Sequence, residues 1–455
     1  MTDSSGLQRS LGSTDLALIT AGTVIGSGIF LTPGIVLQNT GARTGVALGV
    51  WAVSGVLSLL GALTYAELGA MKPHAGGLYV YLRDAFGPLP AFLYGWASFA
   101  VISSGSVATL AVAFAGYLGG IVPLGGLPPQ VVSVALIAVA AAINVAGTRR
   151  SANVQNWMTA AKVGGLLALS AILLSRGHAA ATAPGAFPPL AATSLAAGVG
   201  AAMIATLWAY EGWQYVTFSA GEARDPQRTF PRAITVATIG LIALYLLVNL
   251  GYLAALGPEA AARSERIAAD AVGTVLGPAA GTLVAVLILV SISSALNGLT
   301  LTTPRMYYSM AQDGVFFRRL ARVHPRFGTP AFAVLALAVW SAFLAATGTF
   351  QQLLTYVVFA GWIFYALGAL SVFVYRRREP DAVRPFRTPG YPVTPVFFVA
   401  AAVLLVLNTI ATQPARAGVG LTLVATGVPA FYAWRVTARR RAAAAGGTQE
   451  STPKA

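Results

Sequence analysis

Three glycines and a proline interrupt an otherwise apolar stretch near the start of the chain, TAGTVIGSGIFLTP at residues 20–33. Gly26 and Gly28 flank Ser27, and Pro33 follows, so the spacing predicts one unwound turn in a helix. An unwound turn frees backbone N–H groups on one side and C=O groups on the other, and the helix dipoles add partial charges of matching sign. We therefore expect this turn to bind a small molecule that carries both charges on one carbon.

A second interruption, WAYEGWQ, lies at residues 208–214. The indole of Trp208 is placed to cover a bound substrate as a gate. Tyr210 and Trp213 fit a place at the membrane interface as well as they fit a place at the site. Glu211 is an ionisable group inside an apolar segment and has three interpretations. It caps the half-helix that follows, reads a cationic substrate side chain, or carries a proton.

Together the two interruptions predict a site for a zwitterion. Its carboxylate would contact the amides around Ser27 and Gly28 and the hydroxyls of Thr23 and Ser27. Its ammonium would contact carbonyl groups near Val24 and at the second interruption. The complete candidate substrate site is Thr23, Val24, Ile25, Gly26, Ser27, Gly28, Trp208, Ala209, Tyr210, Glu211 and Gly212.

One cation, Lys162, lies inside an apolar segment, about seven residues or roughly 10 Å from its start. One interpretation is that its side chain reaches back to the membrane surface. We favour an internal role, in which the ammonium binds carbonyls at the first break and the serine cluster at Ser291, Ser293 and Ser294, a set of oxygen ligands that would otherwise suit a sodium ion. Lys162, Ser293 and Ser294 are therefore the candidate substitute for an ion site.

The elements that position these residues are membrane-spanning helices. Only 9% of the 455 residues are charged, 56% are hydrophobic and the mean hydropathy is +0.71, which is typical of an integral membrane protein. The apolar blocks are long enough to cross a bilayer as helices and too continuous for barrel strands. Twelve blocks are expected, at residues 14–38, 44–70, 87–119, 129–147, 155–175, 192–221, 232–256, 275–310, 330–347, 350–376, 393–413 and 417–436.

The net charge of +15 is a signal of topology rather than of nucleic-acid binding. Most of the 29 lysines and arginines fall on one side of a twelve-span arrangement, which places both termini in the cytoplasm. Residues 1–13 are expected to be a cytoplasmic segment rather than a signal peptide, and residues 437–455 a disordered basic tail. The chain has no cysteine and three scattered histidines, so we expect no disulfide, metal or other cofactor.

The two interruptions are five spans apart, in the first and sixth. An odd separation inverts the second half relative to the first, and paired interruptions are typical of inverted-repeat transporters with a site at mid-membrane. We therefore predict an all-α membrane domain over residues 14–436. It comprises repeat one at 14–175, repeat two at 192–376 and two peripheral helices at 393–436, with helices 1 and 6 unwound mid-membrane.

Taken in order along the chain, these features resemble the amino acid–polyamine–organocation superfamily, and within it the L-type amino acid transporters. The resemblance covers nearly the whole chain. It rests on GTVIGSGIFLTPG at 22–34, YAELGAMKPHAGGLYVYLRDAFG at 65–87, Lys162, AYEGWQYVTFSAGEARDPQRTFPRAI at 209–234, NGLTLTTPRMYYSMAQDGVF at 297–316 and HPRFGTP at 324–330.

The resemblance implies a LeuT-like fold and sodium-independent movement of amino acids, often as exchange, with no enzymatic reaction. It assigns Thr23, Ser27 and Gly28 to the carboxylate, Val24 to the amine and Lys162 to the sodium-like site. Two departures concern the second break: Glu211 stands where the family varies between acidic and small residues, and Gln214 replaces a common asparagine.

Small or medium neutral L-amino acids are the expected substrates. A proton-coupled symporter, a cationic amino acid carrier and a membrane sensor that binds without transport stay open. Because the chain has no cysteine, no disulfide-linked heavy chain is expected, and we expect a monomer or weak oligomer that works alone. Its arginine-rich and alanine-rich composition suggests the cytoplasmic membrane of a bacterium.

Overall fold

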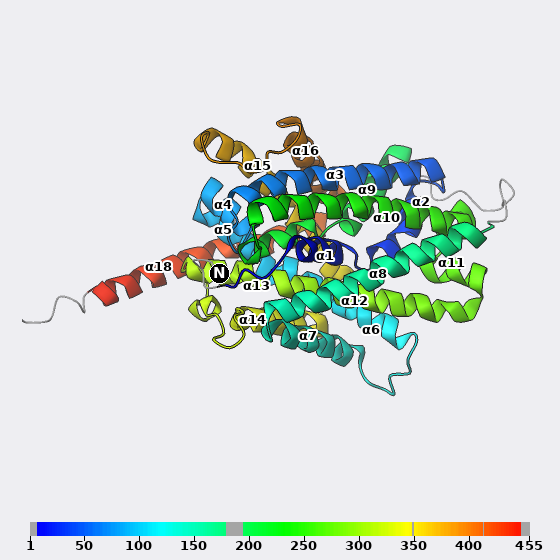
Figure 1. The fold of residues 1–455 in the computed structure, drawn as a ribbon, viewed down its shortest axis with the longest axis horizontal. Coiled ribbons are helices and arrows are strands. Elements are labelled where there is room, and N and C mark those ends of the chain that lie inside the picture. Colours follow the sequence, from blue (N-terminus) through cyan, green and yellow to red (C-terminus); the bar gives the residue numbers. More distant parts are fainter. Residues whose placement is uncertain (1–6, 179–193, 348–349, 413, 447–455) are drawn as a thin grey trace, which may run out of the picture.

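The chain folds into a bundle of helices in the computed structural model, which describes residues 7–178, 194–347, 350–412 and 414–446 (Figure 1). The first part contains α1 (Ser13–Val24), α2 (Gly28–Asn39), α3 (Thr44–Met71), α4 (Leu78–Phe86), α5 (Pro88–Ala97), the π-helical turn η1 (Ser98–Ile102), α6 (Ser103–Gly119), α7 (Pro129–Val145) and α8 (Thr148–Arg176). The next part contains α9 (Leu195–Ala209), the 3₁₀ helix η2 (Trp213–Glu222), α10 (Pro226–Arg263), α11 (Ile267–Leu276), η3 (Pro278–Ala280) and α12 (Gly281–Thr302). The last part contains α13 (Pro304–Gln312), η4 (Arg318–Ala321), α14 (Ala331–Thr347), α15 (Phe350–Arg378), α16 (Val393–Thr412), α17 (Pro414–Ala425) and α18 (Gly427–Gly446).

Every predicted span coincides with helical residues. Within the described part of the chain, seven helices are long and apolar enough to cross a membrane, or eight if the bent pair α1 and α2 counts as one span. The chain is therefore an all-helical, multi-pass membrane protein. Two short helices, α4 and α11, lie in stretches that the sequence analysis left as loops, and α18 continues to Gly446, into the segment predicted to be a disordered tail.

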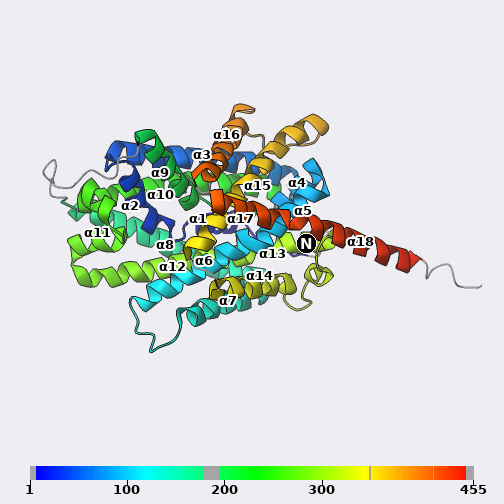
Figure 2. The ribbon, with the colours of Figure 1, turned by 180° about the vertical axis from the view of Figure 1, so that it is seen from behind.

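The long helices run side by side along the length of the molecule (Figures 1 and 2). The N-terminal residues and the protruding end of α18 lie at one end of the bundle, and α11 lies at the opposite end. We refer to these as the α18 end and the α11 end. Helices α1 and α2 sit inside the bundle, between the α3 and α10 pair and the α8 and α12 pair.

The first span is broken where the glycines predict it. Helix α1 ends at Val24, α2 begins at Gly28, and their axes differ by 47°. The break is short because Ile25 and Gly26 still donate backbone hydrogen bonds, to Ala21 and Val24 respectively. Pro33 lies inside α2, where its missing N–H further weakens the first turns of that helix.

The sixth span is broken as well, and a glycine explains the shape of the break. Helix α9 ends at Ala209, and Gly212 has φ of 132°, a value that L side chains rarely adopt. A Cβ atom on Gly212 would lie 2.7 Å from the carbonyl oxygen of Thr23. Only glycine therefore lets the two breaks approach each other this closely. After it the chain continues as the tighter 3₁₀ helix η2 rather than as an α-helix.

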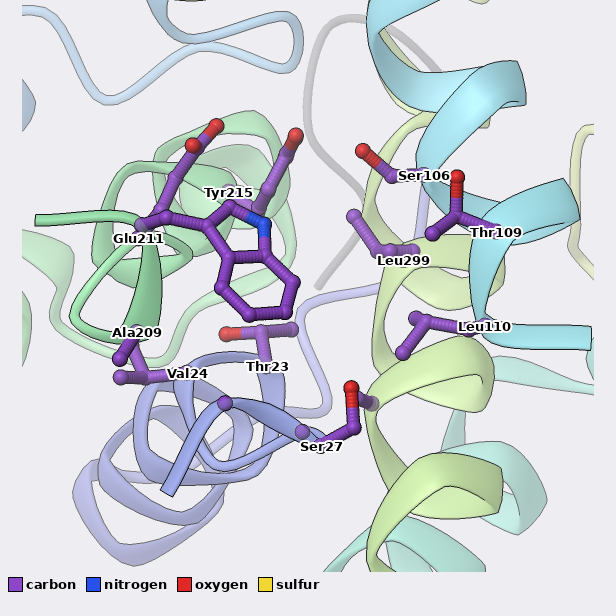
Figure 3. A pocket seen from close by; sticks show the side chains of 14 residues that line it. Thr23, Val24, Ser27, Ser106, Thr109, Leu110, Ala209, Glu211, Tyr215 and Leu299 are labelled. Carbon is purple, nitrogen blue, oxygen red and sulfur yellow. The ribbon is translucent and has the colours of Figure 1, made fainter. Parts of the chain in front are cut away.

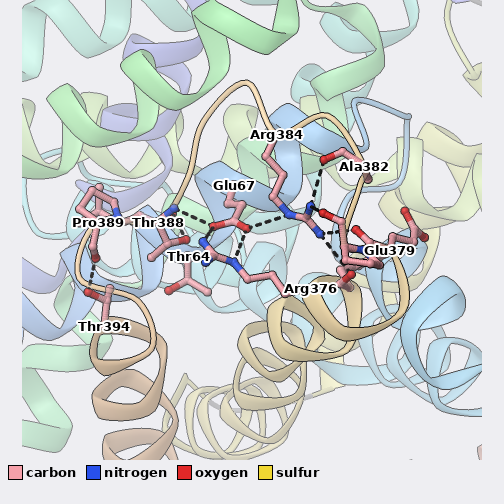
Figure 4. Close-up of polar contacts among 12 residues, drawn as sticks. Thr64, Glu67, Arg376, Glu379, Ala382, Arg384, Thr388, Pro389 and Thr394 are labelled. Carbon is pink, nitrogen blue, oxygen red and sulfur yellow. Dashed lines mark hydrogen bonds and ion pairs between the residues drawn. The ribbon is translucent and has the colours of Figure 1, made fainter.

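A buried carboxylate holds α3, α15 and the loop after α15 together at the α18 end (Figure 4). Glu67 is 2% exposed, and its two oxygens accept hydrogen bonds from Nε and Nη2 of Arg376 at 2.9 and 2.8 Å. The backbone N–H of Thr388 donates to Oε2 of Glu67 at 2.7 Å, and Arg384 Nε lies 3.6 Å from Oε1. A two-pronged Arg–carboxylate pair of this kind fixes both charge and orientation.

We expect Glu67→Ala to lower the free energy of unfolding by about 3–5 kcal/mol, because it leaves Arg376 without its buried partner. Glu379→Ala is the matched control. It removes the partner of Lys72 from a pair whose side chains are 25% and 39% exposed, and such a pair contributes about 0–1 kcal/mol. Thermal unfolding of the two purified variants in detergent measures the difference. Equal losses of stability would contradict the structural importance of the Glu67 cluster.

Candidate functional site

A small cavity of about 70 Å³ lies where the two breaks meet (Figure 3). Side chains after α9 face those of α6 across it, and Thr23 and Ser27 form its floor in this view. Its lining residues are Thr23, Val24, Gly26, Ser27, Gly28, Ser106, Thr109, Leu110, Trp208, Ala209, Glu211, Tyr215, Ala295 and Leu299. Eight of the eleven predicted substrate residues are among them, whereas Ile25, Tyr210 and Gly212 are not.

Opposite helix ends converge at this cavity. Helix α9 ends at Ala209, and α1 at Val24, so each presents carbonyl oxygens and the negative end of its dipole. Helix α2 begins at Gly28 with free N–H groups and the positive end of its dipole. A Cβ atom on Gly28 would lie 3.0 Å from Cα of Ala209, so the positive and negative ends lie next to each other. The arrangement matches a ligand with a carboxylate beside an ammonium.

The Ser27 hydroxyl is the free hydrogen-bonding group on the floor of the cavity. Its oxygen is buried and has no hydrogen-bond partner within the described residues. A buried hydroxyl without a partner costs free energy, and a ligand carboxylate in the cavity would supply the missing acceptor.

Thr23 connects the two breaks through its hydroxyl. Its Oγ1 lies within hydrogen-bonding distance of the carbonyl oxygens of Ile19 (2.9 Å), Thr20 (2.9 Å) and Gly212 (3.0 Å). The single hydroxyl proton is therefore directed to backbone carbonyls, and Thr23 joins the first break to the second. Its predicted contact with the substrate carboxylate stays a prediction.

Tyr245 of α10 also joins the two breaks, through its hydroxyl. This residue was not predicted from the sequence. Its hydroxyl lies 3.3 Å from the carbonyl oxygen of Val24 and 3.1 Å from that of Ala209. These are two of the carbonyls expected to bind a substrate ammonium. The Val24 oxygen also accepts the Gly26 N–H at 2.9 Å, and the single Tyr245 proton can go to only one of the two carbonyls. Since each carbonyl oxygen has two lone pairs, both keep one for the ammonium when Tyr245 donates to Ala209, its nearer acceptor.

Glu211 does not cap the following helix, so that interpretation was wrong. Gly212 occupies the cap position of η2, and its N–H is bonded to Oε1 of Gln214 at 3.1 Å instead. Oε1 of Glu211 accepts a hydrogen bond from the Tyr365 hydroxyl at 2.8 Å, while Oε2 is buried without a partner in the described structure. One carboxylate oxygen thus remains available at the cavity.

The three aromatic residues of the second interruption are placed differently from one another. Trp208 lines the cavity, as a gate would require. Tyr210 and Trp213 are 1% and 3% exposed, so the membrane-interface interpretation was wrong for both. Tyr210 packs against Trp51 and Tyr245, and Trp213 packs edge-on against Tyr65.

Lys162 is internal, and the interpretation that its side chain reaches the membrane surface was wrong. The side chain is fully buried, and Nζ donates to the carbonyl oxygens of Gly22 at 2.7 Å and Ile25 at 2.5 Å. The carbonyl oxygen of Ser291 lies 3.5 Å away. The ammonium therefore lies among three backbone oxygens at the first break, a ligand set that would also suit a hard metal cation.

The serines that contact Lys162 were only partly predicted. Ser291 binds the same turn, since its hydroxyl lies 3.1 Å from the Ile25 carbonyl and 2.9 Å from that of Gly26. Ser294 faces away, toward Gln155 Nε2 at 3.2 Å. Neither Ser294 nor Ser293 has a hydrogen bond to Lys162 in the described structure. The first-break carbonyls and Ser291 are therefore confirmed as neighbours of the Lys162 ammonium, whereas the prediction was wrong for Ser293 and Ser294.

A fully buried ion pair fixes η2 beneath the second break. Nε of Arg305 lies 2.6 Å from Oε2 of Glu222, and neither side chain is exposed. Nη2 of Arg305 also lies 2.8 Å from Oγ1 of Thr148, and Nη1 donates to the Leu301 carbonyl. This cluster joins η2 to α8, α12 and α13. The sequence analysis missed it because its members lie far apart along the chain.

The cavity contains residues from α6 and α12 that the sequence analysis also missed. Thr109 is one of them, and its buried hydroxyl has no partner within the described residues. The hydroxyl-rich run SSGSVAT at residues 103–109 was the available signal. Among all the residues that the structure describes, no group of three His, Asp or Glu side chains could hold a metal ion.

The chain is similar to known proteins over most of its length. The family model described as "Amino acid permease" matches residues 11–431. The b(0,+)-type amino acid transporter 1 of Homo sapiens is 35% identical over 90% of this chain and 84% of its own length. The serine/threonine exchanger SteT of Bacillus subtilis is 29% identical over 95% of this chain and 98% of its own length. The cystine/glutamate transporter of Homo sapiens is 30% identical over 91% of this chain and 83% of its own length.

Proposed function

Since the chain belongs to the amino acid permease family, a family of membrane transporters and not of enzymes, we propose that it exchanges amino acids across the membrane without sodium. The observation that carries this proposal is the cavity at which the dipole ends of α1, α2 and α9 converge, with the Lys162 ammonium bound to the same break. The names of the relatives, which include a transporter and an exchanger of amino acids, support the same activity.

In the proposed complex the substrate carboxylate binds the Ser27 hydroxyl and the first amides of α2, at the positive end of the helix dipole. The ammonium binds the carbonyls of Val24 and Ala209. Thr23, Ile25, Gly26, Gly28, Tyr210 and Gly212 shape the two breaks, and Trp208 covers the substrate. The cavity volume of about 70 Å³ is below the roughly 300–1,000 Å³ of drug-sized ligand pockets. It therefore suits a small amino acid.

Sodium independence follows from Lys162. Its ammonium occupies the position among the Gly22, Ile25 and Ser291 carbonyls in which a sodium ion would bind. A cation fixed to the chain satisfies these oxygens, so no external cation is required for the break to keep its shape.

The proposed architecture is two inverted repeats of five helices, at about residues 14–175 and 192–376, with helices 11 and 12 peripheral. Rocking of one helix group against the other would expose the cavity to each side in turn. We place the chain in a bacterial cytoplasmic membrane with both termini inside. That orientation agrees with the position of the N-terminal residues and α18 at one end of the bundle. Without cysteine it would work with no disulfide-linked heavy chain.

The test is uptake of labelled amino acids into sodium-free liposomes that contain the purified protein. We expect unlabelled amino acid inside the vesicles to accelerate uptake strongly, because exchange requires a substrate on the return step. Equal uptake into empty vesicles would indicate uniport or, if a pH gradient drives it, proton symport. Substrate binding without any flux would indicate a sensor.

A cationic amino acid is the second candidate substrate, because the free Oε2 of Glu211 lies at the cavity. Glu211→Gln keeps the acceptor for the Tyr365 hydroxyl but removes the charge. If cationic side chains bind there, we expect this variant to lose about 10–100-fold in their apparent affinity, the value of a charged hydrogen bond, and less than threefold for neutral substrates. Competition assays with both classes measure the ratio. Equal effects on cationic and neutral amino acids would exclude recognition of the substrate charge by Glu211.

A further inference from the structure

Exposed arginines gather where α18 leaves the bundle, beside η4. They are Arg318, Arg319, Arg322, Arg326 and Arg435, and we call them the arginine patch. None of them forms an ion pair within the part of the chain that the structure describes. Arg83 and Arg149, at the same end of the bundle, each pair with a carboxylate instead. The patch therefore presents positive charge that no side chain of the described residues neutralises.

Aromatic rings hold the two parts of the patch together. The Trp434 ring of α18 lies 5.2 Å from the ring of Phe317 and 5.7 Å from that of Phe316, the two residues before η4. Trp434 also packs against Phe92 and Trp96 of α5, with ring centres 6.1 and 6.3 Å away. Figures 1 and 2 both show the connection between α13 and α14 beside α18. Two elements that are far apart in the sequence thus form one surface.

The patch lies at the level where the membrane ends. The apolar span Ala417–Val436 ends within α18, and Trp434 and Tyr432 near its end are of the aromatic types that gather at membrane interfaces. Three more arginines, at 439–441, follow on the same helix. At 1.5 Å per residue the last of them is about 10 Å beyond Trp434. The headgroup layer of a bilayer is roughly 5–8 Å thick on each side, so this stretch of α18 crosses it.

We propose that the arginine patch binds the phosphate groups of anionic phospholipids in the leaflet at the α18 end. A guanidinium donates two parallel hydrogen bonds to a phosphate, and basic clusters directly beside a membrane span attract anionic headgroups. The topology of the chain requires only that arginines lie on this side of the membrane. A lipid site also requires them to be close together, unpaired and at headgroup level, as they are here.

A lipid bound across η4 and α18 would tie the last helix to the connection that follows α13. Helix α13 continues α12, which contributes Ala295 and Leu299 to the substrate cavity. The lipid would therefore support the span beside the cavity from the membrane surface. This role does not depend on which amino acid the chain transports, or on whether it transports one.

The test is displacement of a fluorescent phosphatidylglycerol from the purified full chain in neutral detergent. Unlabelled phosphatidylglycerol and phosphatidylcholine with the same acyl chains are the two competitors. We expect phosphatidylglycerol to compete about tenfold more strongly at low salt, and high salt to reduce the difference, because salt screens exposed charges. Equal competition by the two lipids would overturn the proposal. Glycerol 1-phosphate carries the phosphate without acyl chains, and its competition at the same concentration would show that the patch binds soluble phosphate esters rather than lipid.

Replacing Arg318 and Arg319 together with glutamine should remove most of the preference for phosphatidylglycerol, a loss of about tenfold in its apparent affinity. Both are exposed and unpaired, so the variant should unfold at the wild-type temperature. The matched control replaces Arg224 and Arg228, two exposed arginines at the start of α10 that also lack an ion pair in the described structure. An equal loss in the control would overturn the assignment to the patch and indicate a general attraction to positive charge.

Discussion

Replacing Ser27 with leucine is expected to abolish both amino acid binding and exchange. The hydroxyl oxygen of Ser27 is buried at the cavity without a partner in the described structure, and the leucine side chain would fill much of a cavity of about 70 Å³. Ser27→Ala keeps the space but removes one hydrogen bond to a charged group, so it should weaken binding by about 1.5–3 kcal/mol, or roughly 10–100-fold. Binding of labelled amino acid to the purified variants measures both effects.

Gly26→Ala is the matched control for these two variants. An added Cβ on Gly26 would meet Leu110 at 3.6 Å and Ala295 at 3.8 Å, which are ordinary contacts. This change alters the same turn without blocking the cavity, so binding should fall by less than about fivefold. Retained binding in Ser27→Leu, at a yield and thermal stability close to wild type, would show that the substrate binds elsewhere.

Removing the Lys162 ammonium is expected to have the second-largest effect. Lys162→Met keeps the apolar part of the side chain but leaves the Gly22 carbonyl without its buried donor and the Ile25 carbonyl with the Ser291 hydroxyl alone. An unsatisfied buried acceptor costs about 1–3 kcal/mol, and the turn can avoid that cost only by changing shape. We therefore expect exchange to fall at least tenfold, measured in sodium-free proteoliposomes.

Lys72→Met is the control for the loss of a lysine charge, since the Lys72 ammonium forms a partly exposed pair with Glu379 and lies over the Tyr375 ring. It should exchange at close to the wild-type rate. If Lys162→Met exchanges as fast as Lys72→Met, the ammonium is not needed to hold the first break. Sodium would then have to be tested as its replacement in the variant.

The breaks could be predicted from the sequence because they depend on local backbone properties. Gly26 and Gly28 on either side of Ser27 weaken one helical turn whatever packs around it, and the end of α1 at Val24 and the start of α2 at Gly28 follow from that. Lys162 could be predicted as internal because an ammonium this deep in an apolar segment requires acceptors, and the first break supplies carbonyls.

The partners of the site residues could not be predicted, because they depend on the rotation of each helix about its axis. Ser291 and Ser294 lie three residues apart, so a rotation of only about 60° decides which of them faces Lys162. The bond from Tyr365 to Glu211 and those from Tyr245 to both breaks join residues far apart in sequence. Glu211 shows the consequence: its carboxylate would fit a helix cap locally, yet α15 offers it the Tyr365 hydroxyl instead.

The most direct test of the site uses the absence of cysteine from the chain. In Ser27→Cys the new thiol is the sole reactive one, and its modification rate by a small methanethiosulfonate reagent can be followed with and without amino acids. We expect each amino acid that the protein exchanges to slow modification of Cys at position 27, with half-protection near its binding constant. Amino acids that the protein does not exchange should have no effect. Unchanged modification at saturating concentrations of an exchanged amino acid would contradict the placement of the substrate between the two broken helices.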